Sequence, residues 1–209
     1  MATNFTLNIT IPTQSDAVPV MSVFSWIIIN QRLGITFNWD LPWADYKAGF
    51  GSVDADFWLG LEKMHLLTSS QSYRLRVEVQ RNSTKFWFSA EYWSFKIGDE
   101  LNDKYRLEVD GYSGDAGDAL MYEGDVNNNG IFGNWLHNGM VFSTYDRDHD
   151  NTPVNCAANY DGGWWYNACH YGCITCRSPG NQWRTLPGSG PGTYGTSKLV
   201  NSRMMIKRQ

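Results

Sequence analysis

A strict alternation of apolar and polar residues between Tyr73 and Gln80 is the clearest pattern in the chain. Tyr73, Leu75, Val77 and Val79 occupy every second position, with arginine, glutamate and glutamine between them. A period of two predicts an antiparallel strand that buries one face and exposes the other. Three more strand-like runs are expected to pair in the same sheet: residues 85–92, 105–110 and, near the end of the chain, 198–207.

The front of the chain predicts two further strands and one helix. Residues 4–9 alternate polar and apolar side chains, and the apolar run 22–30 is typical of a buried strand. Asp54 is a favourable N-cap for a helix. One apolar face follows it at helical spacing, formed by Phe57, Leu61, Met64 and Leu67.

Glycine, asparagine and aspartate become frequent from Gly111 onward. These residues favour turns, and binding residues are concentrated in loops that a rigid scaffold positions. The pattern therefore predicts the α+β fold class, with a twisted antiparallel sheet, few short helices and a loop-rich C-terminal part.

Composition and charge narrow the class of protein. With 209 residues, the chain can bury one full core as a single domain. It contains 10 Trp, 11 Tyr and 10 Phe but only 18% charged residues, which indicates a rigid, aromatic-rich globule. The formal net charge of -4 gives no signature of nucleic-acid binding. The longest apolar run, residues 23–29, is too short to span a bilayer, so no membrane insertion is expected.

An acidic loop directly before Cys156 carries the main functional signal. Asp146, Asp148 and Asp150 alternate with basic side chains. In an extended loop both Asp148 and Asp150 can face one ion, and hard oxygen ligands suit Ca²⁺. The alternative is a solvated acidic turn beside a disulfide. Three aspartates in one short loop are better suited to binding one cation than to acting as the separate acid and base of a glycosidase. The sequence also contains no nucleophile, zinc-protease or phosphate-loop motif. No enzyme activity is therefore expected.

Several short motifs surround this loop in a fixed order. They are 46–51 (YKAGFG), 57–62 (FWLGLE), 117–120 (GDAL), 138–140 (NGM), 142–144 (FST), 155–157 (NCA), 164–165 (WW) and 169–170 (CH). Together they resemble the fibrinogen-like domain, the C-terminal globule of fibrinogen chains, ficolins, tachylectins, angiopoietins and tenascins. The resemblance implies one such domain over residues 1–209. Its expected parts are an N-terminal lobe at 1–45, a central sheet from 46–117 with 198–208, and a loop-rich binding lobe at 118–197.

The resemblance also assigns a calcium site. Asp148 and Asp150 are implied as side-chain ligands, and the backbone carbonyls of Thr152 and Val154 complete the protein shell. The family has glycine where this chain has Val154, which follows Pro153. Extracellular sites of this kind bind Ca²⁺ with dissociation constants on the order of 0.1–1 mM.

A small ligand pocket is implied beside the metal loop. By resemblance, Cys156 pairs with Cys169, and the backbone N–H groups of Cys169 and His170 point at a ligand carbonyl. Tyr160 and His170 match pocket residues of ficolins and tachylectins, with Trp165 as a further wall. Such a pocket captures the acetamido group of N-acetylated sugars. The alternative is that the tryptophans belong to the core and His170 is a structural donor.

The chain departs from the family pattern after His170. A longer family stretch, which carries the remaining pocket wall, is reduced here to residues 171–182. The added pair Cys173 and Cys176 is predicted to form a second, local disulfide. The alternatives are a redox motif or a zinc site shared with Cys156 and Cys169.

An insertion and three sequons complete the candidate sites. Asp125, Asn127 and Asn129, followed by Gly130, form the first half of an EF-hand-like loop, although Leu136 stands where the bidentate glutamate is needed. A second calcium ion or a plain Asn-Gly turn is expected there. Asn4, Asn8 and Asn82 are N-glycosylation acceptors, and with the resemblance they predict a secreted, extracellular parent whose leader is missing and which can form oligomers through segments absent here.

Two functions follow from these observations. The first is a secreted, calcium-dependent lectin for N-acetylated sugars or other acetylated ligands. The second is a protein-ligand module of angiopoietin or tenascin type, with a structural calcium site and no sugar binding. Tyr160 and His170 favour the first function, whereas the shortened stretch 171–182 favours the second.

Overall fold

A computed structural model describes residues 5–13, 17–34, 36–123, 135–177, 181–188 and 197–209 of the chain. The strands in these ranges are β1 (Phe5–Thr10), β2 (Ala17–Val23), β3 (Trp26–Leu33), β4 (Phe50–Gly51), β5 (Phe57–Trp58), β6 (Tyr73–Arg81), β7 (Trp87–Ile97), β8 (Leu107–Gly114), β9 (Gly172–Cys173), β10 (Gln182–Trp183) and β11 (Leu199–Arg208). The helices are α1 (Trp43–Ala48), α2 (Leu61–Ser70), α3 (Glu100–Asp103) and α4 (Cys156–Tyr160).

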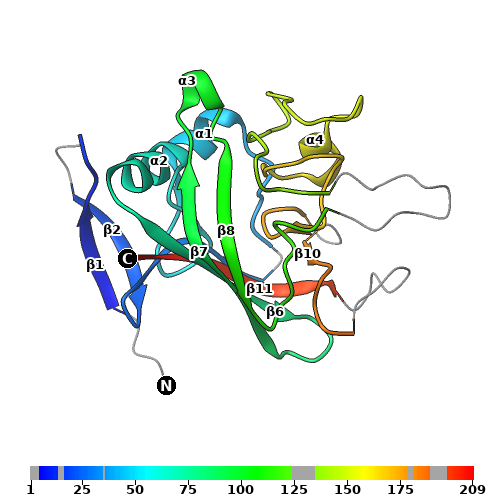
Figure 1. The fold of residues 1–209 in the computed structure, drawn as a ribbon, viewed down its shortest axis with the longest axis horizontal. Helices are drawn as coiled ribbons and strands as arrows, with labels where there is room; N and C mark the ends of the chain where they lie inside the picture. Colours follow the sequence, from blue (N-terminus) through cyan, green and yellow to red (C-terminus); the bar gives the residue numbers. More distant parts are fainter. Residues whose placement is uncertain (1–4, 14–16, 35, 124–134, 178–180, 189–196) are drawn as a thin grey trace.

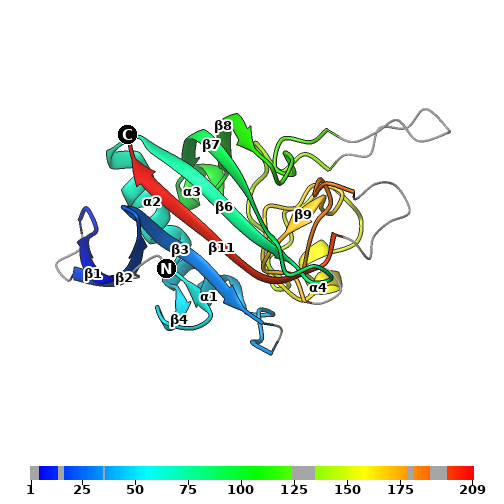
Figure 2. The same ribbon diagram turned by 90° about the horizontal axis from the view of Figure 1, so that it is seen from below.

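One twisted antiparallel sheet organises the molecule, with the strand order β1-β2-β3-β11-β6-β7-β8. The last strand, β11, lies in the middle of this sheet, where it pairs with β3 on one side and with β6 on the other (Figure 2). The predicted α+β class, the strand at Tyr73–Arg81 and the return of the C-terminal strand to the sheet are confirmed. Residues 135–177 form a loop-rich region beside the sheet (Figure 1).

The core lies between the inner face of the sheet, helix α2 and the loop-rich region. Alternate residues of β6, including Leu75 and Val77, are buried, and Met64 of α2 is fully buried. Aromatic rings fill the space toward the loops, where Trp58 packs near Phe142. Within the described ranges, no helix combines the length and apolar character needed to cross a membrane.

The predicted helix start at Asp54 is wrong. Phe57 and Trp58 form β5 and pair with β3, and the helix begins only at Leu61 after the N-cap Gly60. Gly60 has φ 107°, and a Cβ there would approach the Ala48 carbonyl oxygen to 2.7 Å. The chain therefore turns sharply at a position that only glycine fits, which a helical apolar pattern does not reveal.

The apolar run 22–30 is not one strand. A hairpin turn at Phe24 and Ser25, with φ of 48° and 66°, separates β2 from β3. Neither residue is the glycine or asparagine that marks such turns, so the sequence hides the break. The strands β1, β2 and β3, which lie in the N-terminal part expected at 1–45, belong to the main sheet, and β3 pairs directly with β11.

A buried arginine ties the sheet to the loop-rich region. Arg32, near the end of β3, is 1% exposed. Its Nη1 donates to the carbonyl oxygens of Ile174 at 3.1 Å and Cys176 at 2.5 Å, and its Nε donates to Gly34 O at 3.0 Å. Burial lowers the pKa of this guanidinium, and the nearby Asp56 opposes that shift. The loop carbonyls thus depend on a donor that is distant in sequence.

Replacing Arg32 should therefore destabilise the fold strongly. Arg32→Met keeps much of the side-chain volume but leaves buried carbonyls without donors, so we expect a loss of about 3 kcal/mol or more in the free energy of unfolding. Urea unfolding measures it. Arg177→Met is the matched control, because Arg177 forms an exposed pair with Asp161 and should cost less than about 1 kcal/mol. Equal losses in the two variants would contradict the anchoring role.

Candidate functional site

The acidic loop is fastened to the core by Asp146. Its Oδ1 accepts hydrogen bonds from the backbone N–H of Trp43 at 2.9 Å and from Thr144 Oγ1 at 2.7 Å. Trp43 begins α1, so the loop is held against a helix a hundred residues earlier in the chain. Asp146 therefore orients the loop.

Asp148 and Asp150 share one short turn. Asp148 Oδ1 accepts from the backbone N–H of Asp150 at 3.3 Å. Asp150 accepts from Thr152 N at 3.0 Å and from Cys156 N at 2.8 Å. Burial raises the pKa of Asp150, and the neighbouring Asp148 carboxylate raises it further. The two carboxylates are thus close enough to repel each other, which is the situation a bound cation relieves.

The oxygen groups of the loop fit a hard cation. The available donors are the two carboxylates and the backbone carbonyls around Thr152 and Val154, and the Val154 side chain is exposed. Among the described residues, no group of three or more His, Cys, Asp or Glu side chains is placed to hold a metal. Any calcium ion here would therefore take two carboxylates, and carbonyls or water would supply the rest.

Two asparagines connect the acidic loop to the pocket segment. Asn155 caps α4 by accepting from Ala158 N at 2.9 Å, and α4 ends at Tyr160. Asn151 donates from its backbone N–H to Asn167 O at 3.1 Å, and its side chain donates to Asn167 Oδ1 at 2.9 Å. Asn167 N in turn donates to Cys169 O at 2.9 Å. Both sides of the predicted pocket are therefore attached to the loop.

Both predicted disulfides are present. Cys156 is bonded to Cys169 and Cys173 to Cys176, and no free cysteine occurs among the described residues. All four sulfur atoms are used in bridges, so the alternative of a four-thiolate zinc site does not hold in this structure. The Cys173–Cys176 bridge is fully buried beside the Tyr166 hydroxyl, 3.0 Å from Cys176 Sγ.

His170 lies buried beneath Tyr160. The two rings meet edge to face with centroids 4.5 Å apart, and His170 is 2% exposed while Tyr160 is half-buried. Neither ring nitrogen of His170 has a hydrogen-bond partner among the described residues. Within the same ranges, the backbone N–H groups of Cys169 and His170 donate to no acceptor. Burial lowers the pKa of His170 well below its ordinary value, with Arg184 and His137 adding repulsion.

Trp165 does not line the pocket, contrary to the expectation from sequence. It is fully buried, its Nε1 donates to Tyr105 O at 2.7 Å, and its ring packs edge to face on Phe142. The Trp-Trp pair belongs to the core because Trp164 and Trp165 face the aromatic cluster behind the loop. The core interpretation of these tryptophans is therefore the correct one.

Three residues that support the candidate site were not identified from the sequence. His137 is buried, its Nδ1 lies 2.6 Å from Trp165 O, and its Nε2 accepts from Tyr171 N at 3.1 Å. Thr175 donates to Gly163 O at 2.6 Å, and Arg177 N donates to Tyr160 O at 2.8 Å. The shortened stretch after His170 thus braces the segments on both sides of the pocket. No local motif marks these roles, because each partner is distant in sequence or is a backbone group.

Some predicted sites lie outside the described residues. These are Asp125, Asn127 and Asn129 of the second calcium loop, and the sequon at Asn4. The other two sequon residues, Asn8 and Asn82, are exposed to solvent. Asn8 lies on β1, and Asn82 lies in the turn between β6 and β7.

Comparison with known proteins decides the family. Residues 21–185 match the model of the C-terminal globular domain of fibrinogen beta and gamma chains. The chain belongs to the fibrinogen C-terminal family. It is 45% identical over 152 residues to the rat (Rattus norvegicus) fibrinogen alpha chain, covering 71% of this chain and 18% of that protein. The chain thus spans less than a fifth of this relative.

Solved structures show the same fold. The fibrinogen-like globe domain of human ANGPTL2 is 30% identical, with a TM-score of 0.81, and the match covers 99% of this chain and 93% of that one. Lamprey fibrin D-dimer, complexed with the peptide ligand Gly-His-Arg-Pro-amide, is 28% identical with a TM-score of 0.77, covering 92% and 65%. The chain therefore has the fold of a fibrinogen-like globe domain.

Acid should destabilise the domain through His137. Burial lowers its folded-state pKa to about 4, below the ordinary 6.5. The unfolded chain therefore takes up the proton first, so the stability contributed by neutral His137 is complete above about pH 6.5 and is lost as the pH falls toward 4. The loss amounts to roughly 3 kcal/mol.

Urea unfolding between about pH 7 and pH 4.5 measures this effect, because linkage relates its slope to proton uptake. Carboxylates also titrate in this range, so the comparison is with His137→Gln, which should show a shallower loss. The same pH dependence in both proteins would contradict the assignment.

Proposed function

We propose that this fibrinogen-like domain is a calcium-dependent lectin that binds the acetyl group of N-acetylated sugars or of other acetylated ligands. The observation that carries the proposal is that neither the buried His170 ring nor the adjacent backbone N–H groups find a hydrogen-bond partner in the part of the chain that the structure describes. Buried polar groups in proteins almost always have partners, and a bound molecule is one source of such a partner. A carbonyl oxygen can accept from these donors.

The surroundings suit an acetyl group in size and polarity. Tyr160 provides an aromatic surface beside His170, against which a methyl group can pack. Burial keeps the His170 ring neutral, as its lowered pKa indicates, so the site favours a neutral carbonyl over a charged carboxylate. The ligand has to enter beside Tyr160, because that half-buried ring covers the histidine.

Calcium supports the pocket indirectly in this proposal. The carboxylates of Asp148 and Asp150 hold the ion. The hydrogen bond between Asn151 and Asn167 connects the ordered loop to the pocket segment. Asn155, at the end of the loop, caps the helix that carries Tyr160. The ion supplies charge neutralisation for the two carboxylates and thereby fixes the loop.

A second function has an observation in its favour. His170 is nearly inaccessible, and Trp165 is withdrawn into the core, so less pocket surface is available than in the lectin interpretation. A structural neighbour, lamprey fibrin D-dimer, is known as a complex with a peptide ligand. The alternative is therefore a protein-ligand module in which the calcium loop is structural.

An extracellular location fits both functions. Two disulfides form and persist in oxidising compartments, and two sequons lie on exposed positions. We infer that the domain is part of a secreted glycoprotein, whose N-linked chains are attached at Asn8 and Asn82.

Calcium should raise the melting temperature of the wild-type domain. With a dissociation constant of about 0.1–1 mM, 10 mM Ca²⁺ stabilises the native state by about 1.5–3 kcal/mol, or roughly 3–10 °C. Asp148→Ala should lose most of this gain. Without calcium the variant should be at least as stable as the wild type, because the repulsion on Asp150 is removed.

Scanning calorimetry with calcium and with EDTA measures both effects. Asp103→Ala, which removes a partly exposed carboxylate of α3, is the control and should keep the calcium response. If the melting temperature of the wild type is the same in calcium and in EDTA, the metal site is excluded.

The domain should bind N-acetylglucosamine with a dissociation constant no better than about 1 mM, because the ligand offers few atoms. Saturation-transfer NMR should show a signal for N-acetylglucosamine but not for glucosamine. Tyr160→Ala and His170→Asn should each remove the signal while the melting temperature stays close to that of the wild type.

Tyr145→Ala is the matched control, because this exposed tyrosine lies outside the pocket and its loss should leave the signal unchanged. Equal, negligible signals for both sugars in calcium-saturated protein would reject the lectin and favour the protein-ligand module.

A further inference from the structure

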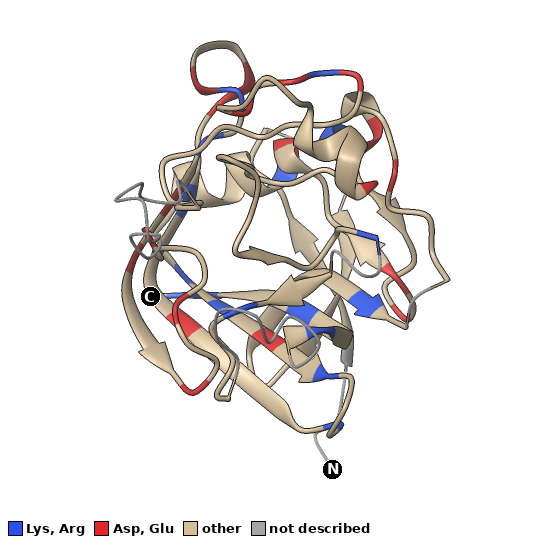
Figure 3. Cartoon of the chain, turned by 90° about the vertical axis from the view of Figure 1, so that its right-hand side faces the viewer, with Lys and Arg blue, Asp and Glu red and all other residues tan. Residues whose placement is uncertain are grey.

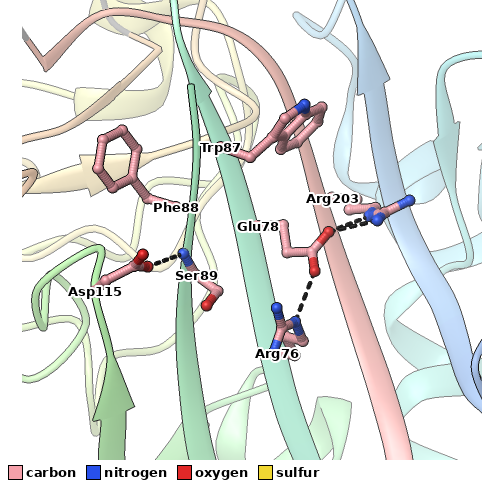
Figure 4. Close-up of a pocket in the computed structure, with 7 residues that line it drawn as sticks. All are labelled: Arg76, Glu78, Trp87, Phe88, Ser89, Asp115 and Arg203. Atoms are coloured by element: carbon pink, nitrogen blue, oxygen red, sulfur yellow. Dashed lines mark hydrogen bonds and ion pairs between the residues drawn. The ribbon is translucent and has the colours of Figure 1, made fainter. Parts of the chain in front are cut away.

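A shallow cavity of about 330 Å³ opens on the outer face of the central sheet. Side chains of β6, β7 and β11 line it, together with Asp115 after β8 (Figure 4). None of its lining residues belongs to the acidic loop or to the pocket around His170. Its volume lies at the lower end of the range of about 300–1,000 Å³ that is typical of small-molecule sites.

Basic side chains outnumber acidic ones on the outer face of the three strands that line the cavity, although the whole chain carries a net charge of -4. They are Arg74, Arg76, Lys96, Arg203 and Lys207, against Glu78 and Glu91, whereas the neighbouring strand β8 adds Glu108 and Asp110 to the same face. Lys and Arg lie on several strands of the sheet, where acidic residues also lie, and further acidic residues lie on loops (Figure 3). Any attraction of an anion to this face therefore comes from the local arginines and not from a basic surface as a whole.

A single carboxylate holds the two arginines of the cavity in place. Glu78 accepts from Arg76 Nε at 2.7 Å and from Arg203 Nε at 2.6 Å and Nη2 at 2.5 Å. Arg76 also pairs with Glu91. Each guanidinium has five N–H donors, so both keep donors for a ligand while their orientation is fixed. About a quarter of each arginine side chain remains exposed, 28% and 24%.

Trp87 provides an aromatic wall. This tryptophan is 46% exposed, and its ring lies 5.8 Å from the Arg203 guanidinium carbon. The guanidinium and the ring support each other, which keeps the indole face upright at the cavity rim. A large exposed aromatic side chain with a fixed orientation offers a flat apolar surface on which the C–H face of a sugar ring can pack.

The opposite side of the cavity offers an acceptor. Asp115 Oδ1 accepts from the backbone N–H of Ser89 at 2.7 Å, and the second carboxylate oxygen has no partner among the described residues (Figure 4). A hydroxyl group of a ligand can donate to that oxygen. N–H donors for an anion, an aromatic wall and a carboxylate oxygen that can accept from a hydroxyl group therefore surround one space.

We propose that this cavity binds an anionic saccharide unit, a sugar ring that carries a carboxylate or a sulfate. The anionic group pairs with Arg76 and Arg203, the ring packs on Trp87, and a hydroxyl group donates to Asp115. A bare phosphate uses only the arginines and leaves the tryptophan exposed, so the combination favours a sugar. The site is separate from the acetyl pocket and does not depend on that function.

Calorimetric titration of the wild-type domain with matched oligosaccharides tests the proposal. The probes are dextran fragments, the same fragments sulfated, and oligogalacturonate, which all lack acetyl groups. We expect binding of the sulfated or the carboxylated probe, weakened by added salt, and none of neutral dextran. The anionic probe that binds identifies the charged group.

Paired variants locate the site. Trp87→Ala should weaken binding by about tenfold or more, and Arg203→Gln should do the same. Their controls are Trp93→Ala, which removes another exposed tryptophan of β7, and Arg208→Gln on β11, both outside the cavity. These controls and His170→Ala should change the affinity by less than about twofold.

Three results would overturn the proposal. They are no binding of either anionic probe, equal binding of neutral dextran, and equal losses in the paired tryptophan variants. The last would indicate diffuse attraction by the whole face instead of a built site.

Discussion

The buried guanidinium of Arg32 couples the two halves of this molecule. It leaves β3 on the side of the loops and donates to the carbonyls of Ile174 and Cys176. A buried charge is costly unless its donors are used, and the loop carbonyls are costly unless they find donors. The sheet therefore supplies hydrogen-bond donors to the loop carbonyls, and the loop supplies acceptors to the buried guanidinium. This fixes the position of the short Cys173–Cys176 loop against the sheet.

The candidate site inherits its rigidity from this arrangement. The bridged loop supports Gly163 through Thr175 and the end of α4 through Arg177. From the other side, the acidic loop reaches the same segment through Asn151 and Asn167. The segment that carries His170 is thus held from two sides, by the disulfide-bonded loop and by the acidic loop. Such support from neighbouring groups is what places binding groups accurately.

The two faces of the domain differ in chemistry. The loop side offers neutral, buried donors beside a pair of carboxylates, whereas the outer face of the sheet carries arginines and exposed tryptophans. The sheet itself produces this difference, because alternate residues of β6 and β11 point to opposite sides. The same strands that fill the core with Leu75 and Met204 therefore display Arg76 and Arg203 to solvent.

The sequence alone determined the features that depend on local pattern. The alternation in β6 predicted its two faces, the carboxylate spacing predicted the acidic turn, and the motif order predicted the family and the first disulfide. The apolar face Leu61, Met64 and Leu67 was also predicted correctly, although the start of its helix was not. These features follow from periodicity and from short-range geometry, which neighbouring residues fix.

Only the tertiary structure decided the rest. The hairpin at Phe24 and Ser25 and the turn at Gly60 depend on strand pairing with distant segments, which overrides local propensity. The withdrawal of Trp165 into the core, and the roles of Arg32, His137 and Asn167, depend on contacts between residues far apart in the chain. A sequence shows which groups are polar. Which of them are buried, and which are left without a partner, is determined only when the chain has folded around them.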